Sequence, residues 1–168
     1  MDTTRTFKIV QPGGGEKVAL GPLGVDFKLY SQETQGLVSV VEHPFSPRML
    51  VPPHLHTRED EYSIVTQGRI GFRSGDREVV LEAGGYITKP RGELHTMWNP
   101  DDTPSRIIEI ITPGGFERFF GELAELFTSR DGAPDPGELA ALGATYGLSF
   151  DMDWVPELTE RYGLQPMM

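Results

Sequence analysis

The sequence predicts an all-β fold, an antiparallel barrel or sandwich, which is followed by a shorter helical segment. Over residues 17–112, short apolar or alternating runs are separated by frequent turn residues, and no helical pattern lies between them. After residues 113–115, the spacing of apolar side chains changes to that of an amphipathic helix. The chain has 168 residues and no cysteine, so we expect a single domain without disulfide bonds.

The expected strands are bounded by turns rich in glycine, proline, serine and aspartate. In the first strand, Val25, Phe27 and Leu29 alternate with polar neighbours, as in a strand with one buried face. The runs that we expect to be extended cover residues 25–31, 37–43, 61–67, 69–73, 77–81, 86–90, 94–98 and 105–112. Gly68 separates two of them, and SGD at residues 74–76 forms a hairpin turn between two others.

Three helices are expected after the last strand. The first presents an apolar face at helical spacing, which we expect to pack on the barrel: Phe116, Phe119, Phe120, Leu123, Leu126 and Phe127. Asp135 can cap the second helix, with Glu138 completing a capping box and Gly147 ending the helix. The third covers residues 156–163, from a proline to a glycine. We interpret these helices, at about residues 116–164, as an appendage of the barrel within one domain that spans the chain.

The balance of charge argues against nucleic acid and membranes as partners. Asp and Glu number 25 and Lys and Arg 15, which gives a formal net charge of −10. Such a chain repels phosphate backbones and anionic lipids. The start, MDTTRTFKIV, has an early acidic residue and no apolar run, unlike a signal peptide, and no run approaches the ~18 apolar residues of a membrane span. We therefore expect a cytoplasmic protein.

Two histidines stand one residue apart, just before an acidic triplet. In an extended chain His54 and His56 point to the same side, where they and a carboxylate can bind a divalent cation. Glu59, Asp60 and Glu61 are all candidates on chemistry alone. Glu61 begins an apolar run and is expected deeper in the sheet, whereas Glu59 is expected nearer the turn and water. We therefore favour Glu61.

A third imidazole can come from the strand that begins at His95. The turn KPRGE at residues 89–93 reverses the chain just before it. A hairpin that returns beside the first cluster would bring His95 to the same cation.

These residues resemble the two conserved motifs of the cupins, G-x(5)-H-x-H-x(3,4)-E-x(6)-G and G-x(5)-P-x-G-x(2)-H-x(3)-N. The matching residues are His54, His56, Glu61 and Gly68 in the first motif, and Gly84, Pro90, Gly92, His95 and Asn99 in the second. Arg48 departs from the first motif, because it stands where the motif opens with glycine. The resemblance implies a cupin double-stranded β-helix, which is a jelly-roll barrel, and a metal held by the three histidines and Glu61.

Three imidazoles and one carboxylate suit one divalent transition metal, and the sequence does not choose among iron, manganese, nickel, cobalt, copper and zinc. A single small barrel with this ligand set and a helical tail resembles the quercetin dioxygenase-like cupins. That resemblance implies a dioxygenase that uses O2 on an aromatic or enolic small molecule, with Glu61 also acting as the general base. Two alternatives remain: a non-redox metal-dependent isomerase, cyclase or lyase, and a non-catalytic cupin that only binds a small molecule. Exposed sheet edges and the resemblance both predict a homodimer.

The alternation of the strands predicts which side chains surround the metal. Ser63 and Val65 continue the inward face from Glu61, and Met97 continues it from His95, so we expect a largely apolar pocket. We expect no cluster of inward arginine or lysine. His43 lies outside both motifs, and we interpret it as structural or exposed, with a role in the pocket or beside the ligands as the alternative.

Overall fold

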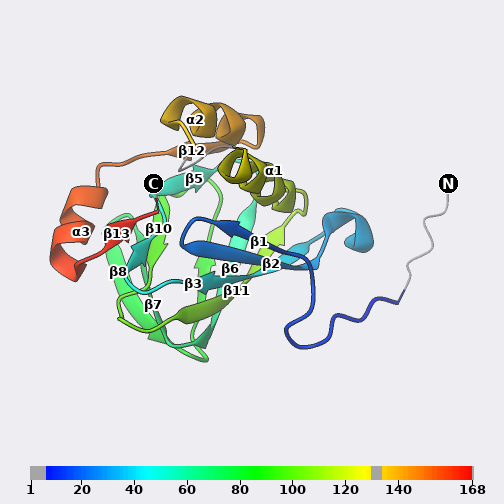
Figure 1. Ribbon diagram of the computed structural model, residues 1–168, viewed down its shortest axis with the longest axis horizontal. Coiled ribbons are helices and arrows are strands. Elements are labelled where there is room, and N and C mark those ends of the chain that lie inside the picture. The colour runs from blue at the N-terminus through cyan, green and yellow to red at the C-terminus, as the bar shows by residue number, and fades with distance from the viewer. Residues whose placement is uncertain (1–6, 130–133, 168) are drawn as a thin grey trace.

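The computed structural model describes residues 7–129 and 134–167 (Figure 1). Its strands are β1 (Lys17–Leu20), β2 (Leu23–Leu29), β3 (Ser39–Phe45), β4 (Met49–Leu50), β5 (His54–His56), β6 (Asp60–Gln67), β7 (Arg69–Ser74), β8 (Arg77–Glu82), β9 (Tyr86–Lys89), β10 (His95–Trp98), β11 (Ser105–Thr112), β12 (Leu148–Phe150) and β13 (Gln165–Pro166). The helices are a short 3-10 helix (Ser31–Thr34), α1 (Glu117–Thr128), α2 (Pro136–Thr145) and α3 (Val155–Tyr162). The first six residues, where we expect no signal peptide, lie outside the described residues, as do residues 130–133 between the first two helices.

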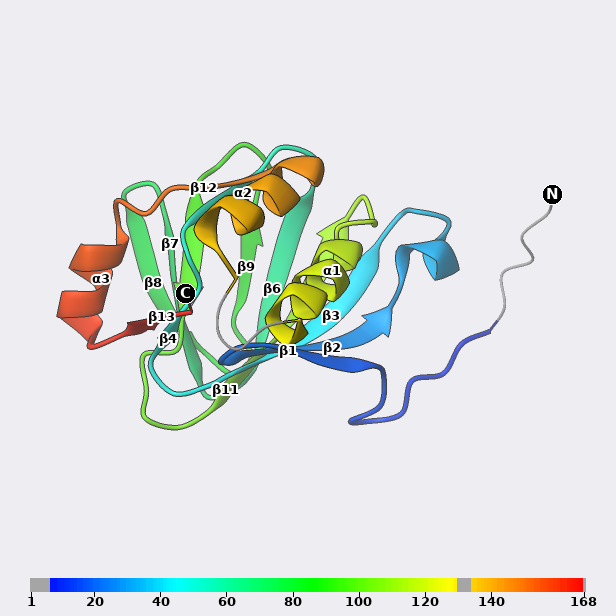
Figure 2. The same cartoon turned by 45° about the horizontal axis from the view of Figure 1, so that its top comes forward.

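The strands form two facing sheets (Figure 2). One has six strands in the order β1-β2-β3-β11-β6-β9. The other runs β12-β5-β10-β4-β13, and β7 joins it through β10 and carries β8 on its other side. Among the described strands every pairing is antiparallel except that of β13 with β4. The predicted all-β jelly-roll fold with a C-terminal helical part is therefore confirmed.

The core lies between the two sheets and follows the period of two that the sequence shows. Along β11, residues 105, 107, 109 and 111 are buried and their neighbours are only partly buried. Along β3, the same alternation buries Val41, His43 and Phe45. Each inward position removes a side chain from water on the shared face. Most of these inward residues are apolar, so His43 and Glu109 stand out as ionisable groups on the core face.

The helix boundaries follow from their caps. Asp135 accepts hydrogen bonds through Oδ1 from the backbone N–H groups of Gly137, at 2.8 Å, and Glu138, at 3.4 Å, so α2 begins at Pro136 as expected. Gly163 follows α3 with a φ of 62°, in the left-handed region that glycine adopts without strain. Both ends were predicted from residue type, because capping depends on local backbone groups alone.

The C-terminal segment is more than the appendage that the sequence predicts. It contributes β12, which pairs with β5, so that Leu148 lies opposite His56 and Phe150 opposite His54. It also contributes β13, which pairs in parallel with β4. These short strands show no pattern of their own in the sequence, and they form because β4 and β5 offer unpaired edges.

Helices α1 and α2 cover one end of the barrel, whereas α3 packs on the sheet that contains β4 and β10. In Figures 1 and 2, α1 packs along β1, and α2 lies beside β12. A small second apolar cluster joins Leu158 and Leu164 of the C-terminal segment to Leu50 and Trp98 of the barrel. Because barrel residues take part in this cluster, it ties the segment to the barrel.

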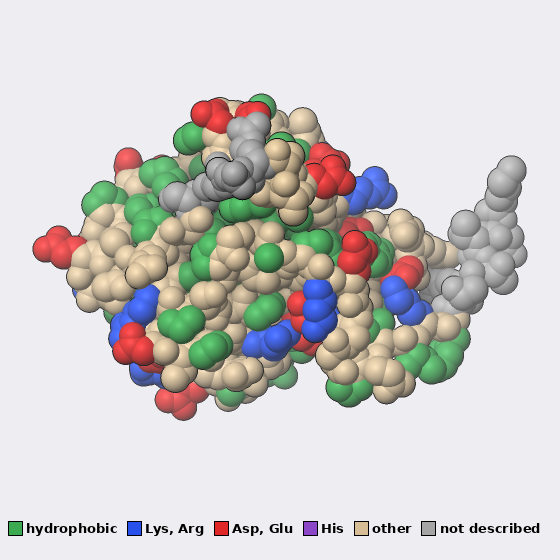
Figure 3. All heavy atoms as spheres, in the orientation of Figure 1, with side chains coloured by type: hydrophobic (Ala, Val, Ile, Leu, Met, Phe, Trp, Pro, Cys, Tyr) green, Lys and Arg blue, Asp and Glu red, His purple; other side chains and the backbone are tan. Residues whose placement is uncertain are grey.

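The outer surface is mixed in charge. On the face shown in Figure 3, Lys and Arg side chains are scattered among acidic ones. Within the described residues, no helix is both long and apolar enough to cross a bilayer.

Candidate metal centre

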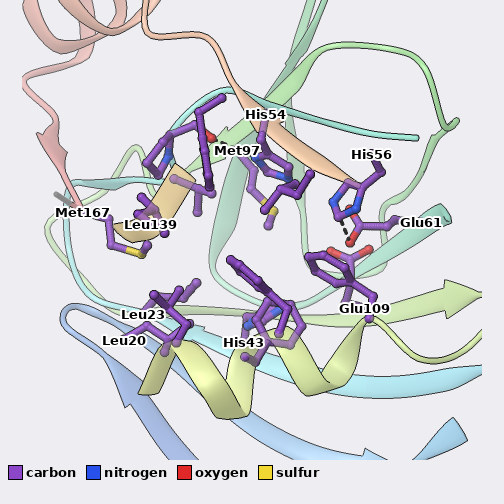
Figure 4. Close-up of a pocket in the computed structure, with 18 residues that line it drawn as sticks. Leu20, Leu23, His43, His54, His56, Glu61, Met97, Glu109, Leu139 and Met167 are labelled. Carbon is purple, nitrogen blue, oxygen red and sulfur yellow. Dashed lines mark hydrogen bonds and ion pairs between the residues drawn. The ribbon is translucent and has the colours of Figure 1, made fainter. Parts of the chain in front are cut away.

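The four predicted ligands meet at one end of the space between the sheets. His54 and His56 come from β5, Glu61 from the start of β6, and His95 from the start of β10. His95 lies directly opposite His54 in the antiparallel pair of β10 and β5. All four side chains are buried, and one potential ligand atom from each lies within 4.8 Å of all the others. Figure 4 shows three of them, His54, His56 and Glu61, at one side of a cavity.

Hydrogen bonds hold the rings of His54 and His95 so that one nitrogen of each is left for the centre. Nδ1 of His54 donates to the carbonyl oxygen of Pro52 at 2.8 Å, and Nδ1 of His95 donates to that of Glu93 at 3.0 Å. A carbonyl oxygen only accepts, so these Nδ1 atoms carry the hydrogen and Nε2 keeps its lone pair. Nε2 of His95 is buried without a hydrogen-bond partner among the described residues. These are the features of a nitrogen prepared to bind a metal.

The spacing fits an ion after a small contraction. Nε2 of His56 lies 3.5 Å from Oε1 of Glu61, and Nε2 of His95 lies 3.4 Å from Oε2. Metal–ligand bonds of ~2.0–2.2 Å place two ligands on opposite sides of an ion ~4.2 Å apart. The largest separation, 4.8 Å, therefore needs to close by only a few tenths of an ångström.

Burial favours the neutral form of His54 and His95. It lowers the pKa of His54 well below its usual 6.5, and repulsion from the neighbouring histidines adds to the effect. Burial also lowers the pKa of His95, although Glu61 opposes the shift. Since a metal binds the neutral ring, these shifts reduce competition from protons at neutral pH.

The three acids of the triplet have three different partners. Glu61 faces the histidines, and Asp60 points away to pair with Arg91, whose Nη2 lies 2.8 Å from Oδ2. Glu59 is buried rather than close to water, and its Oε2 lies 3.4 Å from Nδ1 of His56. The expectation for Glu59 was wrong because β6 begins only at Asp60, so strand alternation does not govern the residue before it. Glu59 therefore lies behind His56, on the side of the ring away from Glu61.

One buried cation beside the centre was missed by the sequence analysis. Lys89, at the end of β9, places Nζ 2.9 Å from Oε2 of Glu61 and 2.7 Å from Oε2 of Glu109. Burial alone would raise the pKa of Glu61, but Lys89 and the histidines together hold it well below its usual value. The sequence signal for Lys89 was its position two residues after Ile87, because residues two apart in a strand lie on the same face.

Glu109 of β11 is the second residue that the sequence analysis missed. It accepts hydrogen bonds from the hydroxyl of Ser63, at 3.0 Å to Oε2, and from Lys89. Burial raises its pKa to about 7, although the Lys89 ammonium opposes the shift. The sequence signal for this group was a glutamate at an inward position of the apolar run IIEII, between Ile107 and Ile111.

The cavity beside the centre has a volume of about 50 Å³, room for roughly four water molecules. His54, His56, Glu61 and Glu109 form its polar side. Its apolar wall comes largely from the C-terminal segment and includes Phe116, Phe119, Phe120, Leu123, Leu139 and Met167. The space therefore suits a short, mostly apolar molecule, and the helices of the tail form part of the site.

Of the three residues that the sequence predicts in the pocket, only one lines the cavity. Met97 lines the cavity, whereas Ser63 and Val65 are buried but do not line it. The hydroxyl of Ser63 is directed at Glu109, and Val65 lies four residues beyond Glu61, roughly 13 Å along an extended strand. His43 lines the cavity and is buried, so the reading of it as exposed does not apply.

Comparison with known proteins agrees with this fold. The family model of the cupin domain matches residues 45–111. Germin-like protein 5-1 of Oryza sativa subsp. japonica is 36% identical over 86 residues, which are 48% of this chain and 38% of that protein. Tetracenomycin polyketide synthase protein TcmJ of Streptomyces glaucescens is 28% identical over 101 residues, 60% of this chain and 62% of that protein. A predicted oxalate decarboxylase of Thermotoga maritima has a TM-score of 0.58 at 18% identity, covering 63% of this chain and 99% of the other.

The family model of the cupin domain covers residues 45–111 of the 168, and the two-sheet fold around this segment is of the cupin type. The chain spans between 31% and 38% of the length of three germin-like proteins that it matches. The likeness to the Thermotoga maritima structure concerns the fold alone. The cluster of His54, His56, Glu61 and His95 suits a cupin metal site.

Proposed function

We propose that the protein is a metal-dependent dioxygenase that acts on a small aromatic or enolic molecule. The observation that carries the proposal is the buried cluster of three imidazoles and one carboxylate at the side of an apolar cavity. Such a set leaves about two coordination positions open on a six-coordinate ion. The metal, when bound, would polarise a coordinated oxygen and, if it is redox-active, support chemistry with O2.

The protein groups would bind and orient the molecule. The aromatic wall of α1 excludes water and holds an apolar body, while the ligands hold its oxygen at the other side. Phe116 packs edge-on against His56, with ring centroids 4.4 Å apart, and so joins the wall to the metal side. A flat phenol or enol of a few atoms matches the narrow space.

We keep Glu61 as the proposed general base as well as a ligand. Its carboxylate is ionised at neutral pH, as a base must be, since Lys89 and the histidines hold its pKa low. The same ion pair weakens it as a base, because a lower pKa means a lower affinity for the proton of the substrate. Proton transfer to Glu61 would therefore depend on a substrate hydroxyl that the metal has already acidified.

A second candidate function is a non-redox reaction, such as a cyclisation or isomerisation, on a polyketide-like molecule. The observation that favours it is the similarity to TcmJ, described as a polyketide synthase protein, over 60% of the chain. Polyketide chains contain enolisable carbonyl groups, and a metal that acts only as a Lewis acid can promote their rearrangement.

The test combines elemental analysis with oxygen uptake. Purified protein is analysed for metals, loaded with iron, manganese, nickel, cobalt, copper or zinc, and supplied with a panel of small phenols and 1,3-diketones. The dioxygenase proposal expects oxygen consumption with at least one redox-active metal and none with zinc. Turnover of a substrate without oxygen consumption would favour the second candidate, and binding without turnover would indicate a non-catalytic cupin.

We also propose that the protein forms a homodimer. β9 is the last strand of the six-stranded sheet, and β8 lies at the end of the other. Tyr86 on β9 is 73% exposed, and Val79 on β8 is 40% exposed. Exposed apolar edges of this kind are often covered by a second copy of the chain.

A further inference from the structure

The fourth histidine of the chain, His43, lies in the wall of the same cavity. It comes from the middle of β3, and its side chain is only 1% exposed. Figure 4 shows it across the cavity from His54, beside the apolar residues that come from α1. Buried polar groups usually have hydrogen-bond partners, so each ring nitrogen calls for an explanation.

The protein itself determines which nitrogen of His43 carries the hydrogen. Nδ1 lies 3.0 Å from the carbonyl oxygen of Gly24, and because that oxygen only accepts, Nδ1 must donate. In the neutral ring, Nε2 is then a hydrogen-bond acceptor. Burial lowers the pKa of His43 to about 4, so the ring remains neutral at neutral pH.

The Nε2 atom of His43 has no hydrogen-bond partner among the residues that the structure describes. It makes no hydrogen bond to any of residues 7–129 or 134–167. His43 is one of the residues that line the cavity, where a bound molecule can supply the missing donor. The rings around it belong to Phe120, with centroids 5.1 Å apart, and Phe45, at 6.5 Å, and neither side chain has an N–H or O–H to donate.

We propose that His43 is a specificity-determining residue whose Nε2 accepts a hydrogen bond from the bound molecule. The inference rests on the proposed function, which places a metal-binding small molecule in this cavity. It adds a second requirement to that molecule, namely a hydroxyl or N–H group on the side away from the oxygen that meets the metal. An acceptor buried in an apolar wall discriminates strongly, because an analogue without the donor leaves it unpaired.

The size of the cavity narrows the class of molecule further. About 50 Å³ admits only a short body between the two polar ends unless side chains move. The metal side and His43 therefore define a compact molecule with a chelating oxygen at one end and a hydrogen-bond donor at the other. Phenols and short enols that carry a second hydroxyl group belong to this class, whereas an enol without a second donor group does not.

The experiment measures binding rather than turnover. Zn²⁺-loaded protein is titrated by calorimetry with 2-hydroxyacetohydroxamic acid and 3-hydroxypropanohydroxamic acid, and with the methyl ether of each. The hydroxamate chelates the metal, while the hydroxyl and its ether differ chiefly in the ability to donate. We expect at least one hydroxyl probe to bind roughly 5- to 100-fold more tightly than its ether, and His43→Phe to abolish that preference.

Two further variants act as controls. Phe120→Leu changes the same wall without removing an acceptor, so it should affect a hydroxyl probe and its ether equally. His43→Gln keeps an acceptor oxygen and should retain part of the preference, and it serves as the test if His43→Phe fails to fold. Circular dichroism and zinc content establish that each variant is intact.

The outcomes separate this inference from the proposed function. If no probe binds the wild type, or if probes bind equally well to a His54→Ala variant that has lost zinc, the proposed function fails and the inference fails with it. If the probes bind through zinc but the wild type shows no preference at either length, the inference alone is overturned. The same conclusion follows if the preference survives in His43→Phe.

Discussion

Nζ of Lys89 lies 2.9 Å from Oε2 of Glu61, which places a buried ammonium group directly against one of the four candidate metal ligands. The same nitrogen lies 2.7 Å from Oε2 of Glu109, so one cation pairs with two carboxylates in the core. All three side chains are buried. The arrangement keeps Glu61 ionised, and the oxygen that pairs with Lys89 also lies 3.4 Å from Nε2 of His95.

Removing this cation should destabilise the metal-free protein. Lys89→Met leaves two buried carboxylates without a counter-ion, and breaking a buried ion pair from one side typically costs ~3–5 kcal/mol. Added Zn²⁺ supplies replacement charge, so the rise in melting temperature on adding zinc should be larger in Lys89→Met than in the wild type. The double variant with Glu109→Leu, which removes the second charge, should recover part of the loss. If metal-free Lys89→Met were as stable as the metal-free wild type, the pairing of Lys89 with the two carboxylates would be contradicted.

The ligand set predicts unequal effects within the acidic triplet. His54→Ala, His95→Ala and Glu61→Ala should lose most of the bound metal, measured by elemental analysis after dialysis. Glu59→Ala removes the carboxylate behind His56 and should weaken affinity by ~10–100-fold without abolishing binding. Asp60→Ala, which breaks only the surface pair with Arg91, is the matched control. Loss of the metal in Glu59→Ala with retention in Glu61→Ala would reverse the choice of ligand.

The variant Glu61→Gln tests the proposed base. It nearly preserves the size of the side chain but removes its charge, and Lys89 keeps Glu109 as its partner, so the fold should persist. We expect partial metal retention through the three histidines and a fall in turnover of ~10²–10⁴-fold. Turnover must be compared at equal metal content. A metal-loaded and fully active variant would place the base elsewhere, with Glu109 as the next candidate.

The burial of His43 predicts a pH dependence of stability. The unfolded chain protonates this histidine near pH 6.5, whereas the folded protein does so only near pH 4, because burial lowers the pKa. As the pH falls below 6.5, the unfolded state therefore binds the proton first and the free energy of unfolding decreases. Between pH 7 and 5, the wild type should lose about 2 kcal/mol more than His43→Phe, since each pKa unit is worth about 1.4 kcal/mol. Urea denaturation of the metal-free proteins measures this, and parallel losses in both would contradict it.

The exposed sheet edges predict the oligomeric state. Sedimentation at micromolar concentration should give twice the chain mass of 18.6 kDa. Tyr86→Lys on the exposed part of β9 should weaken the association if that edge is covered, because a charge in a buried interface carries a desolvation cost. A wild-type mass near 18.6 kDa would rule out the dimer.

Much of the fold could be predicted from local pattern. The alternation of apolar residues in SRIIEIIT predicted the strand that the structure shows at Ser105–Thr112. Asp135 and Gly163 marked helix ends because capping depends on neighbouring backbone groups. The four candidate ligands could be named because their spacing follows the parity of a strand and matches the cupin motifs.

The sequence by itself thus determined the longer strands, the three α-helices and the set of residues that could hold a metal, since each depends on the order of nearby residues. Only the tertiary structure decided what faces that set. Lys89, Glu109 and His43 lie on three different strands, and their approach to Glu61 or to the cavity depends on the register between strands distant in sequence. The pairing of β12 with β5 likewise needs the whole barrel, because three residues have no stable extended form until an open edge accepts their hydrogen bonds.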